Sequence, residues 1–168
     1  MKTGAATIST KRSRAVDFLA LTKPRLNTLV IFTTGIGYCL GSNGSFNLLT
    51  LLHTVIGSTL VAGGAAAYNQ IAERDIDELM ERTRHRPIPT GRVQPWEAFV
   101  MAGLLTALGL VELAVGANLL STAVAATTLV SYVAIYTPLK RRTAWSTVIG
   151  AVPGALPPVI GWAAARGS

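Results

Sequence analysis

The sequence is poor in cysteine and in charged residues. Its one cysteine, Cys39, lies within an apolar run, so neither a disulfide framework nor a cysteine-ligated metal cluster fits within a single chain. Only 14% of the 168 residues are charged, whereas 50% are hydrophobic, and the mean hydropathy is +0.44. Because a water-soluble domain needs a larger polar share to cover its surface, the composition predicts an integral membrane protein.

Acidic residues are scarcer than basic ones, with 8 Asp and Glu against 15 Lys and Arg, which gives a net charge of +7. A nucleic-acid-binding protein would carry such an excess on one face, with aromatic side chains between the charges. Here the basic residues stand at the ends of apolar stretches, so we expect no nucleic-acid binding. No signal-peptide pattern follows the early basic residues, and residues 1–15 are predicted to form a retained cytoplasmic tail.

Five apolar stretches are long enough, or nearly so, to cross ~30 Å of hydrocarbon as helices of roughly 20 residues. They are residues 24–41, 48–71, 96–115, 119–136 and 147–164. Proline, glycine and interfacial aromatic residues stand at several of their edges, as is typical of helix ends. The sequence therefore predicts an all-α membrane bundle that spans the lipid bilayer and forms one domain over residues 16–168.

The basic residues predict the orientation of this bundle. Fourteen of the fifteen fall into three groups, namely the stretch up to Arg25, the stretch between Arg74 and Arg92, and the run 140–142. The connections 42–47 and 116–118 carry none. Because cytoplasmic loops keep an excess of Lys and Arg, the N terminus and the two connections that hold the other groups are predicted to face the cytoplasm, with the chain in the inner membrane. Arg166 is expected on the opposite side.

Small side chains are dense at residues 58–67, and glycines recur four residues apart in the first and fifth stretches. Small residues at this spacing let helices approach closely within a membrane, so we expect tight helix packing. The fifth stretch also contains Pro153, Pro157 and Pro158. Because an interrupted backbone at membrane depth is tolerated where it lines a cavity, this stretch is expected to line a substrate chamber.

The end of the second stretch is acidic. Five of the eight acidic residues lie between Glu73 and Glu81. If the helix continues through them, Asn69, Glu73 and Asp77 follow one another at four-residue steps and form one stripe of oxygen ligands. Mg²⁺ prefers oxygen ligands and is usually held by one or two carboxylates together with substrate phosphates. The stripe therefore predicts a site for a metal-held diphosphate.

Basic residues follow this acidic segment at once. Arg82, Arg84 and Arg86 carry guanidinium groups, which match phosphate oxygens, and a proline-rich turn at 87–91 would fix their directions. The alternative is a solvated helix end in which Glu78 forms ion pairs with basic residues four positions away, and we favour that alternative for Glu78 itself.

The other carboxylates of the segment are treated separately. Asp77 and Glu81 are like charges four residues apart, which favours a cation between or near them. Asp75 points away from the stripe in a regular helix, and its role stays open.

The pattern at 69–77 resembles the first acidic motif of the UbiA superfamily of intramembrane prenyltransferases. Glu73 at its middle position and the string 80–83 are similar to the haem O synthase branch of that superfamily. Further matches lie at 21–25, 136–143, 154–158 and 161–162. The resemblance implies a fold of about nine transmembrane helices, of which this chain holds about five.

The resemblance also implies a reaction, the transfer of farnesyl from farnesyl diphosphate to the vinyl group of haem B. Within it, Mg²⁺ would be held by Asn69, Glu73 and Asp77, and Lys140 would share the catalytic role with them. The substrate-binding residues would be Arg82, Arg86, Tyr136 and Arg141. On the residues alone, the basic run 140–142 is equally explained as a topology anchor. Protein partners implied by the branch are haem A synthase or the terminal oxidase assembly.

Two rival functions remain open on the sequence. One is a UbiA-type polyprenyltransferase that acts on an aromatic or quinone precursor, and the other is a non-catalytic membrane fragment. The second rival arises because no Asp follows Asp77 and no acidic residue follows Glu112, whereas the superfamily has a second Asp-rich motif. We therefore expect the chain alone to be inactive.

Three further ionisable residues are given no catalytic role. His53 is expected to be a packing residue and His85 a loop residue. Glu112, near the outer end of the third stretch, is expected to extend towards the membrane surface, because an ionisable side chain is costly within hydrocarbon.

Overall fold

A computed structural model describes residues 13–143 and 145–167, and within them every regular element is a helix. The long helices are α2 (Pro24–Gly41), α3 (Leu48–Leu79), α4 (Pro95–Gly116), α5 (Leu119–Val130) and α7 (Ser146–Arg166). The shorter ones are α1 (Arg14–Leu21), the π-helical segment η1 (Ser131–Tyr136) and α6 (Thr137–Leu139). The prediction of an all-α bundle is confirmed.

Each of the five predicted stretches forms a helix, and four helices are apolar and long enough to cross a membrane. These four are α3, α4, α7 and the continuous helix Leu119–Leu139 that α5, η1 and α6 build together. Helix α2 is not among them, because Arg25 and Asn27 in its first turn lower its mean hydropathy. Helix α2 has the predicted bounds, and four of the five predicted spans are thus apolar and long enough to cross a membrane.

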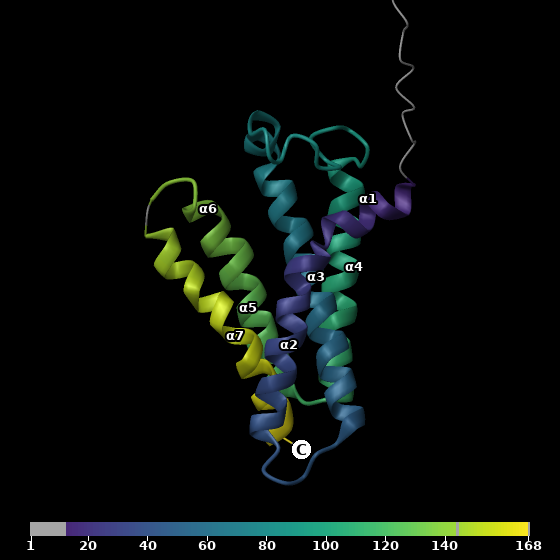
Figure 1. Cartoon of the computed structure of the whole chain (residues 1–168), viewed down its shortest axis with the longest axis vertical. Coiled ribbons are helices and arrows are strands. Elements are labelled where there is room, and N and C mark those ends of the chain that lie inside the picture. Colours follow the sequence, from purple (N-terminus) through teal and green to yellow (C-terminus); the bar gives the residue numbers. More distant parts are fainter. Residues whose placement is uncertain (1–12, 144, 168) are drawn as a thin grey trace, which may run out of the picture.

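The described members of the predicted charge groups gather at one end of the bundle. Figure 1 shows α1, the segment after α3 and the turn after α6 at the upper end, whereas the α2–α3 loop, the α4–α5 connection and the C-terminal end of α7 lie at the lower end. Arg166, at the lower end, places its guanidinium 5.5 Å from the ring centre of Trp162. The side of the membrane on which each end lies stays a prediction. The predicted tail, residues 1–15, lies mostly outside the described residues.

Two asparagine side chains cap helices at the lower end of the bundle. The Asn47 side chain accepts hydrogen bonds from the backbone of Leu49 at 2.9 Å and Thr50 at 3.2 Å, which satisfies free donors of the first turn of α3. Asn118 accepts from the Ser121 backbone at 2.8 Å and so caps α5. Its amide nitrogen also lies 3.0 Å from the Ala163 carbonyl oxygen, which ties α5 to α7.

The expected close packing of small residues is confirmed between α2 and α7. A Cβ atom added at Gly37 would lie 2.0 Å from the carbonyl oxygen of Pro158, and one added at Gly161 would lie 1.9 Å from that of Thr34. Neither position has room for a side chain, because each glycine meets the backbone of the other helix. Helix α7 stays continuous through its three prolines.

The fourth stretch continues beyond the predicted end at Tyr136. Residues 131–136 form a wide π-helical turn, and the helix then continues through Pro138 to Leu139. Proline has no backbone N–H to donate, and a local π-helical adjustment is one way in which a membrane helix accommodates it. Within it, the rings of Tyr132 and Tyr136 stack with centres 5.4 Å apart.

The contact made by Glu112 differs from the one predicted. Its carboxylate does not simply extend towards the membrane surface: Oε1 lies 2.8 Å from Nδ1 of His53 on α3, and both side chains are about one-third exposed. Pairing within the protein lowers the cost of an ionisable group at this depth. His53, predicted to pack, has this polar contact between α3 and α4.

Candidate functional site

The acidic stripe lines a polar cavity at the upper end of the bundle. Helix α3 continues to Leu79, so Asn69, Glu73 and Asp77 lie on one face of it, and they are 2%, 8% and 3% exposed. All three line a cavity of about 1160 Å³. The one-face geometry expected from the four-residue spacing is therefore present.

Each buried carboxylate of the stripe faces a cation. Lys140 donates from Nζ to Oε1 of Glu73 at 3.0 Å, and Asn69 donates from Nδ2 to the other oxygen of that carboxylate at 2.8 Å. Arg86 donates to Oδ2 of Asp77 at 2.5 Å. Charged groups are retained in a protein interior only where they are paired or bound to ions, so this end of α3 concentrates negative charge and attracts cations.

The segment between α3 and α4 brings Arg86 to the stripe. After the helix ends, the Thr83 hydroxyl donates to the Asp77 carbonyl oxygen at 3.1 Å, and the chain turns back over α3. Ile88 and Val93 then pack with Leu21 in a buried cluster. The segment is thus anchored on both sides of Arg86, as the proline-rich turn suggested.

A second contact brings the helix of Lys140 to α3. The Thr137 hydroxyl lies 3.1 Å from Oδ1 of Asn69 and 2.8 Å from the backbone oxygen of Tyr132. Thr137 is 2% exposed, so the contact joins α6 to α3 away from solvent. It places Lys140, one turn further along, beside Glu73.

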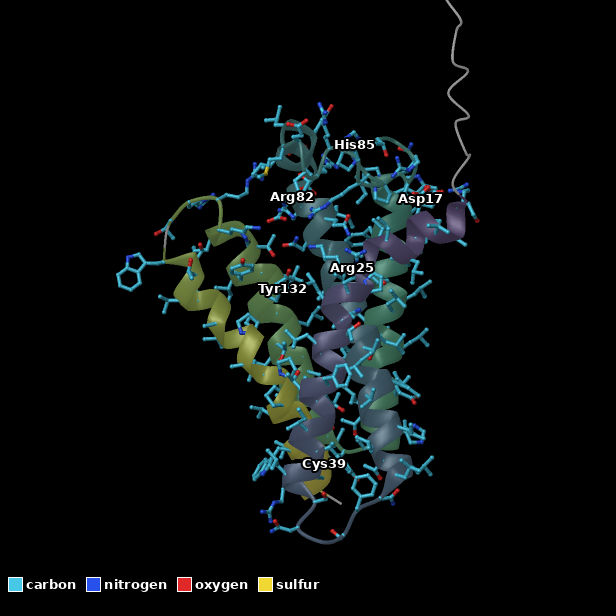
Figure 2. The ribbon with its side chains drawn as sticks, in the orientation of Figure 1. Asp17, Arg25, Cys39, Arg82, His85 and Tyr132 are labelled. Carbon is cyan, nitrogen blue, oxygen red and sulfur yellow. The ribbon has the colours of Figure 1, made fainter. Side chains whose placement is uncertain are left out.

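The remaining predicted substrate-binding residues also line the polar cavity. Arg82, Tyr136 and Arg141 are among its lining residues, and Arg82 and Arg141 are exposed. Figure 2 shows Arg82 and His85 in the segment above α3, and Tyr132 on the neighbouring helix. The structure therefore brings together the whole predicted set, while the roles of its members stay predictions. His85 lies in the predicted loop and also lines the cavity.

Two expectations about the acidic segment need correction, and a third, that Asp75 points away from the stripe, is confirmed. Glu81 lies beyond the end of α3, with 89% of its side chain exposed, and pairs with Arg84 at 3.2 Å, so it shares no cation with Asp77. The cation near Asp77 is Arg86. Within the described residues, Glu78 is found in neither expected ion pair, and Arg74 pairs instead with Asp75 at 3.3 Å. Asp75 does point outwards, with 69% of its side chain exposed.

Several contributing residues were given no role from the sequence. Lys23 and Tyr132 line the polar cavity, and Arg92 reaches Oδ1 of the buried Asp17 on α1 at 2.9 Å. Gln70 donates to the Leu21 carbonyl at 2.9 Å and so fixes the end of α1 against α3. The string 21–25 contained a signal for Lys23, whereas no local pattern pointed to the pairing of Asp17 with Arg92.

An apolar cavity of about 340 Å³ adjoins the polar one. It lies between α2, α3, α5 and α7, and its wall includes Val30, Ala62, Leu129, Pro153 and Pro157. The expectation that the proline-rich helix lines a chamber is therefore confirmed. Four residues line both cavities, and we call them the threshold: Lys23, Leu26, Tyr132 and Tyr136.

The stripe fits a hard divalent cation. It offers two carboxylates and an amide oxygen on one buried face, and Mg²⁺ is commonly held by one or two carboxylates while phosphates complete its shell. In the part of the chain that the structure describes, no group of three or more His, Cys, Asp or Glu residues surrounds a single metal position. A Mg²⁺ ion held by the stripe would complete its shell with water and with a bound anion.

Together the two cavities suit an amphipathic ligand. A polyanionic head would meet the cations of the polar cavity, and an apolar chain would enter the smaller cavity through the threshold. Charge-assisted hydrogen bonds from Arg and Lys are the usual means of holding phosphate oxygens. The arrangement supports the binding of a long-chain phosphate or diphosphate ester.

Comparison of the sequence with known proteins identifies prenyltransferases as its relatives. The sequence model of the UbiA prenyltransferase family matches residues 30–168. The chain is 50% identical over 160 residues to the protoheme IX farnesyltransferase of Solibacter usitatus, covering 90% of this chain and 55% of the relative. It is 44% identical to that of Acaryochloris marina, covering 90% of this chain and 47% of the relative. The chain thus spans about half the length of the curated relatives it matches.

Two solved structures share the fold. A digeranylgeranylglyceryl phosphate synthase structure superposes with a TM-score of 0.77 at 21% identity, covering 88% of this chain and 52% of the other. A UbiA homologue from Archaeoglobus fulgidus bound to DMAPP and Mg²⁺ superposes with a TM-score of 0.70 at 16% identity, covering 89% and 53%. At these identities the likeness establishes the arrangement of helices.

Proposed function

This chain belongs to the UbiA prenyltransferase family, and from that premise we propose that it takes part in the transfer of a prenyl group from a prenyl diphosphate. The observation that carries the proposal is that the two cavities adjoin and share the four residues of the threshold. The diphosphate would lie in the polar cavity beside Glu73 and Asp77, and the prenyl chain in the apolar one. The carbon–oxygen bond that breaks would then lie near the threshold.

Asn69, Glu73 and Asp77 would hold Mg²⁺ on the face of α3. The bound ion would neutralise the diphosphate and so stabilise it as a leaving group. The Mg²⁺ of the Archaeoglobus fulgidus homologue supports this assignment. Lys140 and Arg86 already touch the same carboxylates, so they are positioned to transfer their hydrogen bonds to diphosphate oxygens.

The other residues of the polar cavity would bind and orient the substrate. Arg82 and Arg141 are exposed at its rim, and their guanidinium groups would attract the diphosphate from solution. Tyr136 and the apolar cavity wall would exclude water from the allylic carbon. Exclusion of water matters because a stray water molecule would capture the cation that forms when the diphosphate departs.

We assign farnesyl diphosphate as the donor and haem B as the acceptor, which yields haem O. The relatives at 44% to 50% identity that are named protoheme IX farnesyltransferase support this choice over an aromatic or quinone-precursor acceptor. We further propose that the end bearing the polar cavity faces the cytoplasm from the inner membrane. The proteins that accept or use haem O, such as haem A synthase or the terminal oxidase assembly, would be contacted in the bilayer.

Product analysis tests the assignment. Membranes that contain the chain, co-expressed with the C-terminal half of a full-length relative, would be supplied with farnesyl diphosphate and either haem B or 4-hydroxybenzoate. Haem O formation without prenylation of the aromatic acid is the expected result. Prenylation of the aromatic acid alone would support the rival acceptor, and no product with either would favour a non-catalytic role.

A further inference from the structure

Asp17 is a buried carboxylate that the proposed reaction does not use. It lies on the inner face of α1, where it is 2% exposed, and it falls outside the sets of described residues that line the two cavities. A carboxylate withdrawn from water is costly unless it is paired. The partner of Asp17 therefore indicates what the burial of this charge achieves.

That partner is Arg92, whose guanidinium group joins two segments of the chain. Its Nε donates to Oδ1 of Asp17 at 2.9 Å, and its Nη2 donates to the backbone oxygen of His85 at 2.9 Å. Because a guanidinium group is planar and its N–H groups have fixed directions, the position of Asp17 defines where the His85 carbonyl lies. Figure 2 shows Asp17 on α1 and His85 in the segment above α3.

Helix α1 is held in place by contacts other than that of Asp17. Gln70 of α3 donates to the Leu21 carbonyl oxygen at 2.9 Å, and Arg14 forms an ion pair with Glu97 in the first turn of α4. Both ends of α1 are thus fixed to long helices. Asp17 therefore offers the segment after α3 a rigid point of attachment.

The attached segment carries Arg86, the cation that faces Asp77. Arg86 directly follows His85, so the carbonyl that accepts from Arg92 belongs to the peptide group that joins His85 to Arg86. The segment also closes on itself, since the backbone N–H of Thr90 donates to the Arg86 carbonyl oxygen at 3.2 Å. A displacement of the His85 carbonyl would therefore displace Arg86.

We propose, on the basis of the proposed function, that Asp17 is a positioning residue for the diphosphate site. Acting through Arg92, it holds the peptide group between His85 and Arg86 so that Arg86 stands at the acidic stripe before a ligand arrives. Asp17 itself touches no ligand. Helix α1 thus contributes to anion binding from outside the cavity.

The physical advantage of this arrangement is preorganisation. Arg86 binds an incoming anion at the least cost if its segment already has the bound conformation. If the segment sampled other positions, the apparent affinity would fall in proportion to the fraction of molecules that are competent to bind.

The charge of Asp17 acts in the opposite direction to its positioning effect. A carboxylate near the cavity repels an anion, so its removal alone would raise the affinity for pyrophosphate. Loss of positioning would lower that affinity. The direction of the change therefore distinguishes the two effects.

Calorimetry on the chain in detergent, with inorganic pyrophosphate and Mg²⁺ as the probe, tests the inference. Asp17→Asn should weaken pyrophosphate binding by about tenfold, as expected if about one molecule in ten keeps Arg86 in place. Arg92→Lys should weaken it by a similar factor, because an ammonium keeps the charge beside Asp17 but lacks the planar fork that reaches His85. In an Arg92→Met background, Asp17→Asn should cause no further loss, because Asp17 acts through Arg92.

Two controls separate positioning from charge and from folding. Glu97→Gln removes one negative charge, as Asp17→Asn does, at a residue that pairs with α1 but falls outside both sets of described cavity residues. Its amide oxygen can still accept from the Gln94 backbone, and pyrophosphate affinity should stay within about twofold of the parent. Mn²⁺ binding without pyrophosphate, followed by electron paramagnetic resonance, should be at least as tight in Asp17→Asn as in the parent, because the stripe on α3 is unchanged.

The inference fails if Asp17→Asn binds pyrophosphate as tightly as the parent or more tightly, and the proposed function would then still stand. A further loss when Asp17→Asn is added to Arg92→Met would show that Asp17 does not act through Arg92. Joint loss of Mn²⁺ and pyrophosphate binding in Asp17→Asn would assign the pair to structure alone. If Asp17→Asn does not fold, parental affinity in Arg92→Lys would overturn the inference. A parent chain that does not bind pyrophosphate would overturn it together with the proposed function.

Discussion

Nζ of Lys140 lies 3.0 Å from Oε1 of Glu73, although 67 residues separate the two in sequence. The contact joins the end of the α5–η1–α6 helix to the acidic face of α3. It thereby brings the basic residues that follow α6 to the same site as those that follow α3. Both partners belong to the set expected from the sequence, one as a metal ligand and one as a cation for the diphosphate. If Glu73 holds Mg²⁺ as proposed, Lys140 and the metal ion would compete for the same carboxylate.

If the stripe holds a metal ion, acidic residues of α3 that lie on it should contribute to metal affinity, and those that lie off it should not. Glu73→Gln and Asp77→Asn should each weaken Mn²⁺ binding by at least about tenfold, since even partners outside the ligand set typically change metal affinity by 10- to 100-fold. Glu78→Gln should be nearly silent, because Glu78 is exposed and lies off the stripe. Electron paramagnetic resonance of free Mn²⁺ in the presence of pyrophosphate would measure the three affinities. A Glu78 variant as weak as the other two would contradict the one-face geometry.

Competition between Lys140 and a metal ion for Glu73 predicts that removal of the lysine side chain raises the affinity for the metal. Lys140→Met should bind Mn²⁺ about two- to fivefold more tightly than the parent in the absence of diphosphate, because a half-exposed ion pair is worth little and its loss frees the carboxylate. The same variant should bind pyrophosphate more weakly, since the anion loses a cation. Titration of Mn²⁺ with and without pyrophosphate separates the two effects. Weaker binding of Mn²⁺ alone would show that Lys140 supports the metal site.

The parts of the site that follow from local spacing were predictable from the sequence. Glu73 and Asp77 share a face because helical geometry alone places residues four apart together. Arg86 and Lys140 were expected near them through basic clusters and family resemblance, but their individual partners depend on how distant segments pack. The polar contact of His53 with Glu112 joins two helices, and nothing local to either residue indicated it.

The backbone details of the site were the least predictable. The left-handed conformation of Lys23 and the π-helical turn that stacks Tyr132 on Tyr136 depend on tertiary packing around prolines. The sequence showed Pro24 and Pro138 but not how the chain would accommodate them. Both adjustments contribute residues to the threshold, so the least regular backbone forms the junction between the two cavities.

Burial lowers the pKa of Lys23, which predicts an alkaline decline in pyrophosphate affinity. Because the pKa is below its ordinary value, the ammonium deprotonates at a lower pH than a free lysine does, and affinity should fall as pH rises through that pKa. The charged groups facing it, Glu73, Asp77, Arg86 and Lys140, are shared by the variant Lys23→Arg. That variant should retain affinity to a higher pH, since guanidinium does not titrate there. Identical pH profiles would assign the decline to another group.

The distribution of basic residues predicts which end faces the cytoplasm. Thr90 lies in the segment between α3 and α4 and is exposed, so a cysteine there would be reachable by a soluble reagent. In a Cys39→Ala background, Thr90→Cys should react with a membrane-impermeant maleimide in inverted vesicles and not in intact spheroplasts. A serine residue of the opposite end, Ser45, offers the matched control, because Ser45→Cys should show the reverse pattern. Labelling of Thr90→Cys from the outside would reverse the orientation.

The 168 residues by themselves are expected to form no haem O. The described residues bring two carboxylates to the polar cavity, and each already faces a cation, so one side of a diphosphate clamp is present. The family resemblance implies a second acidic motif that would supply the other side, and a lysine does not replace it, because an ammonium repels the metal that a carboxylate would hold. Haem extracted from membranes of cells lacking their own enzyme would be analysed with the chain alone and with a co-expressed C-terminal half from a relative. Haem O at comparable rates in both would show that the stripe on α3 suffices for turnover.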